Sequence, residues 1–399
     1  MTASDKKILY LSYDGLTDPL GQSQILPYLI GLSSKGFRFV IVTFEKEWRF
    51  RETRMEIETI CLQNDIVWLP KRYHKRPPVL STIFDLLILW RAVGTIIKNK
   101  DISIVHCRSY LTSIVGLAVK RRWNVKFVFD MRGFWADERV EGGLWKLSNP
   151  IYKLAYKFFK KEEIKFLQEA DHVVSLTFSA KEEIESWKIN SAPIMVIPTC
   201  VDLDLFDPAK IDKSKQDALR IELGIGLKDY VLLYLGSWGT WYLIDEMLDF
   251  FLKLKRTKPT AKFLIVTNDK VNLRGLPFQN DILITHAART QVPLHISIAS
   301  ASICLIKPSF SKKASSATKM GEIMAMNVPI VMNKGWGDAE AIIKSSCGVL
   351  YESEQTDVET IVKDNAIIKT REYCQNNLSV ESGTISYSYI YGDLVKNNS

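Results

Sequence analysis

The chain has 399 residues, of which 47% are hydrophobic and 25% charged. This length favours two or three globular domains, and this composition excludes a low-complexity chain. A formal net charge of +8 favours anionic partners such as nucleotides or acidic lipid surfaces. Six scattered cysteines without a CxxC pair argue against a disulfide framework or a zinc site, so we expect a reducing, cytoplasmic compartment.

Short apolar runs rich in β-branched residues alternate with longer helical patterns through the first half of the chain. Continuous apolar runs of this kind are typical of parallel strands that are covered on both faces. One helical pattern between each pair of runs predicts a doubly wound α/β domain. The predicted strands are residues 8–11, 39–44, 66–69, 102–106, 126–130 and 172–176.

The pattern restarts after residues 194–208, a segment rich in Pro and Asp that we interpret as a linker. The second set of predicted strands is 230–236, 262–268, 282–286, 301–307, 329–333 and 347–351. We therefore expect two Rossmann-like domains that face each other across a cleft. The predicted boundaries are 1–200 for the first domain, 201–375 for the second, and 376–399 for a final helix.

The longest apolar segment, residues 83–97, is interrupted by Asp85 and Arg91 and is shorter than the roughly 20 residues that a membrane span needs. We interpret it as a buried amphipathic helix.

Asp5 and Lys6 fall where a signal peptide has apolar residues, so no signal peptide is expected.

Two glycine-containing loops follow predicted strands and lead into helices. The first, SYDGLTDPLGQSQ, contains Gly21 and precedes a helix that we expect to begin near Gln24. The second, LGSWGTW, contains Gly236 and Ser237. Glycine lets a backbone approach a ligand closely, and a helix N-terminus attracts anions. Neither loop is a GxGxxG motif, and a tight strand-to-helix turn remains an alternative for the first.

The segment from 307 to 331 combines a polar loop with the start of a helix. Ser316 and Thr318 offer hydroxyls at the helix N-terminus, where a phosphate would bind. Lys319 would neutralise the phosphate, and Glu322 on the same helix face would accept hydrogen bonds from ribose hydroxyls. A capped helix with one intrahelical ion pair explains the same spacing.

Two basic-apolar segments lie in the first domain. Lys71, Arg72, Lys75 and Arg76 belong to a Pro-bounded loop, which is a candidate for lipid-phosphate or membrane contact. Residues 151–167 predict a helix with an apolar face and a lysine stripe, and we favour a core helix over a membrane-bound one. Nucleic acid is not an expected partner, because the basic loop offers a single aromatic residue for stacking.

The motifs together resemble the GT-B-fold glycosyltransferases of the large retaining family 4. DPLGQSQILPYL resembles the first-domain glycine loop, and FDMRGFWADERVEGG resembles a central loop found in one branch of the family. VIPTCVDLDLFDP resembles the family's IPNGVD linker, and ATKMGEIMAMNVPIV resembles its PTKxxEYMAxGxPVV donor motif. The resemblance covers nearly the whole chain, and it implies that the final helix crosses back onto the first domain.

The resemblance implies roles for residues that match the family's motifs. Glu322 aligns with the acidic residue that binds the donor ribose, and Lys319 aligns with a basic residue near the diphosphate. Gly21 falls where the first-domain loop approaches the donor phosphates. The first glutamate of the family's Glu-x7-Glu motif is Ala314 here, which is a departure. The Arg/Lys pair of the second glycine loop is also missing, and Arg289 is a candidate replacement for its positive charge.

Candidate catalytic residues lie at strand ends of the first domain. The family's first-domain histidine has no clear counterpart, and Asp130 and Arg132 occupy that strand end. His106 ends another strand, and either a structural or a catalytic role is open for it. No metal-ligand cluster is visible, and no cofactor is expected besides the donor substrate itself.

We therefore predict transfer of a sugar from a UDP- or GDP-linked donor to a hydroxyl of a glycan or lipid-linked acceptor, independent of metal. Retention of configuration and a place on the inner face of the cytoplasmic membrane follow from the resemblance. Two alternatives remain open. A sugar-nucleotide epimerase on the same fold would need no acceptor site, and a non-catalytic scaffold would explain Ala314.

Overall fold

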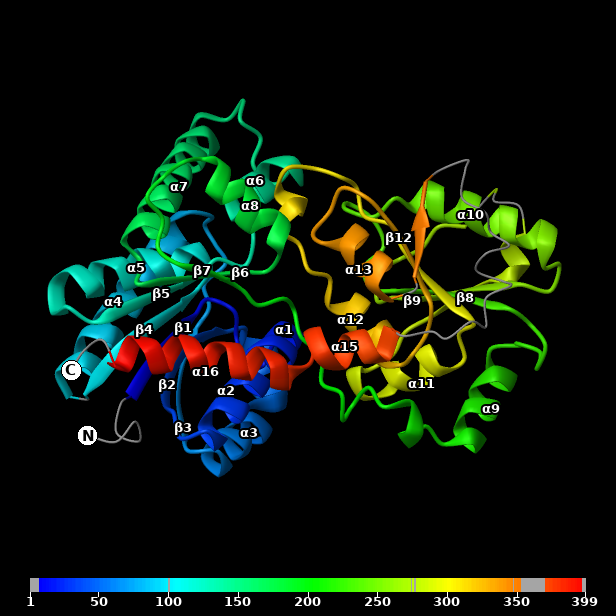
Figure 1. Cartoon of the computed structure of the whole chain (residues 1–399), viewed down its shortest axis with the longest axis horizontal. Helices are drawn as coiled ribbons and strands as arrows, with labels where there is room; N and C mark the ends of the chain where they lie inside the picture. The colour runs from blue at the N-terminus through cyan, green and yellow to red at the C-terminus, as the bar shows by residue number, and fades with distance from the viewer. Residues whose placement is uncertain are drawn as a thin grey trace. The chain divides into compact units, whose positions relative to one another are not determined.

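The structure, a computed structural model, describes residues 7–99, 101–273, 275, 278–346, 348–352 and 370–396. The chain divides into two compact units (Figure 1). Unit 1 comprises residues 1–198 and 380–399, and unit 2 comprises residues 199–379. Each unit contains one sheet whose strand pairs are all parallel. This is the GT-B architecture that the sequence predicts.

Unit 1 contains a seven-stranded sheet in the order β3-β2-β1-β4-β5-β6-β7. Its strands are β1 (Lys7–Ser12), β2 (Arg38–Glu45), β3 (Ile66–Arg72), β4 (Ile102–Arg108), β5 (Lys126–Asp130), β6 (His172–Ser175) and β7 (Ile194–Val196). Nearly every residue of the central strands is buried, since helices cover both faces. The helices are α1 (Pro19–Gln24), α2 (Leu26–Ser34), α3 (Glu47–Gln63), α4 (Leu80–Asn99), α5 (Ser109–Trp123), α6 (Trp135–Glu141), α7 (Pro150–Glu169), α8 (Phe178–Ser186) and α16 (Val380–Lys396).

Unit 2 contains a six-stranded sheet in the order β10-β9-β8-β11-β12-β13. Its strands are β8 (Val231–Leu235), β9 (Lys262–Val266), β10 (Ile282–Thr285), β11 (Ala301–Cys304), β12 (Ile330–Asn333) and β13 (Val349–Tyr351). The α-helices are α9 (Lys213–Glu222), α10 (Ile244–Thr257), α11 (Val292–Ser297), α12 (Thr318–Ala325), α13 (Ala339–Ser346) and α15 (Thr370–Asn377). Short 3₁₀ turns include η4 (Arg289–Gln291) and η5 (Ser311–Ala314).

The strand order reverses between β1 and β4 in unit 1 and between β8 and β11 in unit 2. The connections from neighbouring strands leave in opposite directions at such a point, and a crevice opens at the carboxyl ends of the two strands. Ligands of open α/β sheets bind there. The residues that follow β1, β4, β8 and β11 are therefore the first places to look for function.

The C-terminal helix α16 belongs to unit 1, as the resemblance implies, and it packs against α2 and β4 (Figure 1). Tyr387 and Tyr391 are buried in this contact, whereas Tyr389 is 68% exposed. Thr384 of α16 lies close to Gly31 of α2, where a Cβ atom would come within 2.8 Å of the threonine hydroxyl. The last helix of the chain therefore completes the core of the first unit.

Three local predictions from the sequence were wrong. Residues 194–196, assigned to a linker, form the edge strand β7 because they pair with β6. The glycine loop ends earlier than expected, since Pro19 starts a short helix, α1, that includes Gly21. Lys71 and Arg72 are not in a loop but end strand β3, where they pair with the end of β2. Cys347, at the start of the last predicted strand, lies outside the described residues.

Candidate functional site

A buried lysine lies at the reversal point of the unit 2 sheet. Lys319, in the first turn of α12, is 7% exposed. Its ammonium nitrogen lies 4.3 Å from the ring centroid of Tyr234 and 3.6 Å from that of Tyr242. The same Nζ atom lies 3.3 Å from the Tyr234 hydroxyl. The lysine charge is therefore held by aromatic rings and one hydroxyl.

The glycine loop after β8 leaves room for this ammonium group. Gly236 has φ of +120°, a conformation that side chains rarely adopt. A Cβ atom at this position would lie 3.0 Å from Lys319 Nζ. Ser237 follows, and its backbone carbonyl accepts a hydrogen bond from the Tyr234 hydroxyl. The loop thus brings backbone next to the buried cation at Gly236, and it supplies the ring of Tyr242 further along.

Lys319 forms no ion pair with a carboxylate among the residues that the structure describes. Burial lowers its pKa to about 8, and nearby Glu322 only partly opposes this shift. A buried charge without a charged partner is costly, so such groups usually serve a ligand. This arrangement indicates a site for an anion.

Glu322 lies one turn further along α12, with a side chain that is 8% exposed. Its Oε1 atom accepts a hydrogen bond of 2.7 Å from Arg289 Nη1. The capped-helix interpretation requires an ion pair between Lys319 and Glu322. The structure does not contain this pair, because Glu322 pairs with Arg289 instead. The structure instead brings Arg289 to Glu322 from η4, 33 residues away in sequence.

The two hydroxyl residues proposed for phosphate binding lie close to this site. Thr318 is the first residue of α12. The Ser316 hydroxyl accepts a hydrogen bond of 3.1 Å from the backbone N–H of Thr199, so it joins the α12 loop to the start of unit 2. Ala314, which replaces the family's glutamate, is buried at the end of η5.

In unit 1 the loop after β1 is fixed by one buried carboxylate. Glu45, at the end of β2, accepts hydrogen bonds from the backbone N–H groups of Leu16 and Thr17 at 2.9 and 3.1 Å. It also accepts from the hydroxyls of Thr17 and Thr43. A loop with this many polar groups is stable in the interior because Glu45 satisfies them.

Packing requires glycine at Gly15 in this loop and at Gly21 in α1. A Cβ atom on Gly15 would lie 2.3 Å from Glu45 Oε2, and one on Gly21 would lie 2.0 Å from the backbone oxygen of Gly15. These distances are far shorter than any van der Waals contact. The structure thus gives Gly21 a packing reason, and its proposed role at the donor stays a prediction.

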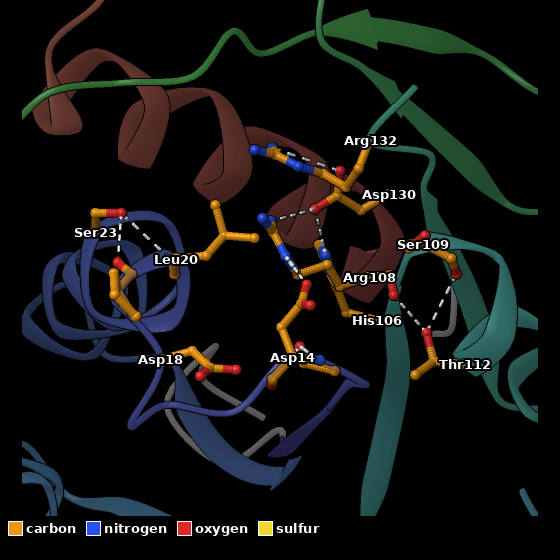
Figure 2. Close-up of polar contacts among 12 residues, drawn as sticks. Asp14, Asp18, Leu20, Ser23, His106, Arg108, Ser109, Thr112, Asp130 and Arg132 are labelled. Carbon is orange, nitrogen blue, oxygen red and sulfur yellow. Dashed lines mark hydrogen bonds and ion pairs between the residues drawn. The ribbon is translucent and has the colours of Figure 1, made fainter. Parts of the chain in front are cut away.

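Four charged or titratable side chains meet at the ends of β4 and β5 in unit 1 (Figure 2). Asp130 is fully buried, with His106 Nε2 at 3.5 Å and guanidinium nitrogens of Arg108 and Arg132 at 3.8 Å. Burial alone would raise the pKa of Asp130, but Arg132, His106 and Arg108 hold it below its usual value. Arg132 adopts a left-handed φ of +55°, a strained conformation for a residue other than glycine.

His106 is fully buried beneath α16. Its Nδ1 atom lies 2.8 Å from the Tyr391 hydroxyl, and its ring stacks on Tyr10 at 4.4 Å between centroids. The Tyr387 hydroxyl donates to Asp130 Oδ2 at 3.3 Å. Burial lowers the pKa of His106, so the imidazole is neutral near pH 7. His106 and Asp130 therefore face the core of unit 1.

Sequence reasoning missed two residues at the reversal point of this sheet. Asp14, in the loop after β1, lies 3.6 Å from Arg108 Nε, and Figure 2 shows Arg108 reaching from β4 toward both Asp14 and Asp130. The Asp14 side chain is 46% exposed. The strand order is the signal that points to these two residues. Asp14 follows β1 and Arg108 ends β4, and the strand order reverses between these two strands.

Helix α4 corrects the expectation of a buried amphipathic helix. Its inner face buries Asp85, Leu89 and Val93, but an outer apolar stripe is 49–64% exposed. This outer stripe consists of Leu80, Ile83, Phe84 and Leu87. By length and composition α4 is the one helix in the described part of the chain that could cross a membrane, and 28% of its apolar window is buried.

Helix α7, which contains the predicted basic-apolar helix 151–167, also differs from the expected core helix. Ile151, Leu154 and Phe158 are 44–71% exposed, whereas Phe159 is buried. Helix α5 packs between α4 and α7, so the two exposed stripes lie on the same side of the sheet (Figure 1). Lys75 and Arg76 are exposed in the loop that leads into α4.

Comparison with known proteins finds a family match in the first half of the chain. Residues 28–205 match the sequence profile of Glycosyltransferase Family 4. No curated protein matches the chain by sequence at a significant level.

Solved glycosyltransferase structures match the whole fold. A glycosyltransferase from Rickettsia africae ESF-5 is 18% identical, with a TM-score of 0.71 over 98% of this chain and 99% of its own. Alr3699/HepE from Anabaena, solved with UDP and glucose, is 12% identical, with a TM-score of 0.69 over 97% and 100%. WaaG, involved in lipopolysaccharide biosynthesis, is 11% identical, with a TM-score of 0.59 over 97% and 95%.

Proposed function

We propose that this chain, a glycosyltransferase whose residues 28–205 belong to Glycosyltransferase Family 4, transfers a sugar from a nucleotide-diphosphate sugar to a hydroxyl of its acceptor. The observation that carries the proposal is Lys319, a buried ammonium group without a carboxylate partner among the described residues, next to the open backbone of Gly236. The UDP and glucose bound by Alr3699/HepE support a UDP-linked donor, with a GDP-linked donor as the other candidate.

The donor site is assigned to unit 2. Negative charge develops on the leaving diphosphate as the glycosidic bond breaks, and fixed positive charge stabilises it. Lys319 would supply this charge, and Gly236 and Ser237 would offer backbone groups to the phosphates. Glu322 would accept hydrogen bonds from the ribose hydroxyls. Metal independence and retention of configuration are parts of the proposal that come from the family resemblance.

The acceptor site is assigned to unit 1. Asp14 is the half-exposed member of the charged group there, so it would meet the acceptor directly. Asp130, His106 and both arginines are too deeply buried for direct contact without movement, so they would act by holding Asp14 in place through Arg108.

Thermal unfolding with a panel of nucleotides tests the donor site. The melting temperature should rise with one of UDP, GDP or ADP and with the matching sugar nucleotide, and EDTA should not change it. A ligand at about a hundred times its dissociation constant adds roughly 2.7 kcal/mol of stability.

Two variants sharpen the test. Glu322→Ala should lose the nucleotide-induced rise, whereas Glu340→Ala, which removes an exposed carboxylate on α13, should keep it. No rise with any nucleotide in the unmodified protein would overturn the donor assignment and favour a scaffold role. A rise that disappears with EDTA would overturn metal independence.

We also propose that unit 1 binds the inner face of the cytoplasmic membrane through α4, with a lipid-linked acceptor or a growing glycan as substrate. The outer stripe of α4 exposes four large apolar side chains beside the basic residues Lys75 and Arg76. An apolar stripe flanked by positive charge suits the boundary between headgroups and acyl chains of anionic lipids. Helix α7, which packs against α5 as α4 does, exposes further apolar residues.

Vesicle flotation tests the membrane proposal. The protein should bind vesicles that contain phosphatidylglycerol more strongly than pure phosphatidylcholine vesicles, and added salt should weaken this binding. Ile83→Asp with Leu87→Asp should reduce binding about tenfold or more, because two apolar side chains lose their insertion. Ile221→Asp, at an exposed apolar residue of unit 2, is the control and should bind normally. Equal binding by both variants would contradict the assignment to α4.

A further inference from the structure

The ion pair between Arg289 and Glu322 has a geometry that suits a role in ligand binding. Arg289 Nη1 contacts only one carboxylate oxygen, Oε1, at 2.7 Å. No described residue donates a side-chain hydrogen bond to the other oxygen, Oε2. Since a carboxylate has about four lone-pair positions, the pair leaves acceptor capacity free on Glu322.

The guanidinium group of Arg289 is held from a second side. It lies over the ring of Phe206, with 5.5 Å between the guanidinium carbon and the ring centroid. Phe206 is itself fully buried, and its backbone oxygen accepts a hydrogen bond of 2.8 Å from Arg371. Arg289 is therefore fixed between a rigid aromatic ring and Glu322, although 30% of its side chain remains exposed.

The charge of Glu322 depends on this partner. Burial raises the pKa of Glu322, and the charge and hydrogen bond of Arg289 oppose this rise, followed by the charge of Lys319 on the same helix. These are the charged groups that act on Glu322 from the elements around it. If a neutral residue replaced Arg289, the buried carboxyl group of Glu322 would titrate at higher pH, and its proton would occupy an oxygen that should accept a hydrogen bond.

We infer that Arg289 is a positioning residue that keeps Glu322 ionised and oriented, so that its free oxygen accepts the hydroxyl groups of the donor's ribose. This inference rests on the proposed donor site. It differs from direct neutralisation of the diphosphate, because Arg289 acts through Glu322. It also sets a specificity, since a carboxylate held in this way discriminates ribose from 2′-deoxyribose by the hydrogen bond that the latter lacks.

Nucleotide binding measured by calorimetry between about pH 5.5 and 7.5 tests the inference. The probes are the nucleoside diphosphate that stabilises the unmodified protein best and its 2′-deoxy analogue. Protonation of the diphosphate below about pH 7 affects every protein variant alike, so each variant is compared with the unmodified protein at the same pH. The unmodified protein should keep its affinity to lower pH, because Arg289 opposes the rise that burial causes in the pKa of Glu322. Arg289→Gln should bind about tenfold more weakly at the acidic end, with affinity that rises with pH as Glu322 loses its proton.

Two further variants separate a positioning role from a structural one. Arg289→Lys keeps the positive charge and should restore the pH profile of the unmodified protein. Glu322→Gln cannot titrate, so combining it with Arg289→Gln should remove the pH dependence that Arg289→Gln adds. The preference for ribose over 2′-deoxyribose should fall in Arg289→Gln and in Glu322→Gln.

The outcomes distinguish the inference from the proposed function. If Arg289→Gln binds the nucleotide like the unmodified protein across the pH range, the ion pair is merely structural and the inference is wrong while the donor site stands. If Arg289→Gln binds more weakly by the same factor at every pH, Arg289 contacts the ligand directly and the inference is also wrong. If the unmodified protein binds no nucleotide, the donor assignment fails and the inference fails with it.

Discussion

Replacing Asp130 by alanine should lower the free energy of unfolding by about 3–5 kcal/mol, the typical cost of leaving buried charges without their partner. Asp130 is the shared carboxylate of Arg108 and Arg132, whose side chains are 4% and 10% exposed. Its removal also takes away the acceptor of the Tyr387 hydroxyl on α16. Both arginines would then keep their charge in the interior of unit 1, where Arg108 would have only the half-exposed Asp14 as a remaining partner.

Urea denaturation measures this effect, with Asp14→Ala as the matched control. Asp14 also contacts Arg108, but its side chain is 46% exposed, so its removal should cost no more than about 1 kcal/mol. Asp130→Asn keeps the shape and one acceptor, and it should fall between the two. A stability of Asp130→Ala close to that of the unmodified protein would mean that the arginines find other partners, and that Asp130 does not organise the acceptor side.

The affinity for the donor nucleotide should depend steeply on pH through Lys319. Burial lowers the pKa of Lys319 to about 8 in the ligand-free protein. The protonated ammonium group binds the diphosphate, which is itself fully ionised above about pH 7. Affinity should therefore be constant between about pH 7 and 8 and should fall as pH rises above about 8, approaching about tenfold per pH unit.

Three variants test this prediction by titration calorimetry from neutral to alkaline pH. Lys319→Met should lose nucleotide binding at every pH. Lys319→Arg should bind without the alkaline loss, because a guanidinium group does not titrate there. Lys334→Met, which removes an exposed lysine paired with Glu352, should behave like the unmodified protein. Unchanged affinity in Lys319→Met would contradict the assignment of the anion site.

The sheets were predictable from the sequence because buried parallel strands leave a strong signal. Twelve runs of β-branched and apolar residues coincide with twelve strands, and the central strands are buried almost throughout. Residues 194–196 are also apolar, but the run is short and leads into a segment rich in Pro and Asp, so it was assigned to a linker. Helix α1 was missed because Pro19 and Gly21 suggest a loop, although Pro is favoured in the first turn of a helix.

The candidate sites were only partly predictable, because their geometry depends on distant residues. Lys319 and Glu322 followed from a motif and a helical spacing. Their partners, Tyr234 and Arg289, come from other elements, and nothing local in the sequence links them. In unit 1 the sequence indicated Asp130 and Arg132 at a strand end, but it did not reveal how deeply they are buried.

Helix α4 shows why composition alone misassigns an amphipathic segment. Asp85 was counted as a break in an apolar run, yet it is fully buried and accepts hydrogen bonds from the Tyr13 hydroxyl and from the backbone and ring of His74. The polar residue therefore faces inward, and the apolar residues around it face outward. A pattern that counts residues without knowing their partners does not show which face of the helix is buried.

Sugar transfer by the purified protein tests the central claim most directly. The protein would be incubated with radiolabelled UDP-sugars and GDP-sugars and a lipid extract from membranes of the organism that encodes it, with Glu322→Ala in parallel. We predict that label from one donor enters an organic-soluble product with release of the nucleoside diphosphate, and that Glu322→Ala forms none. If no donor yields labelled product, or if Glu322→Ala is as active as the unmodified protein, the donor site described for unit 2 is wrong.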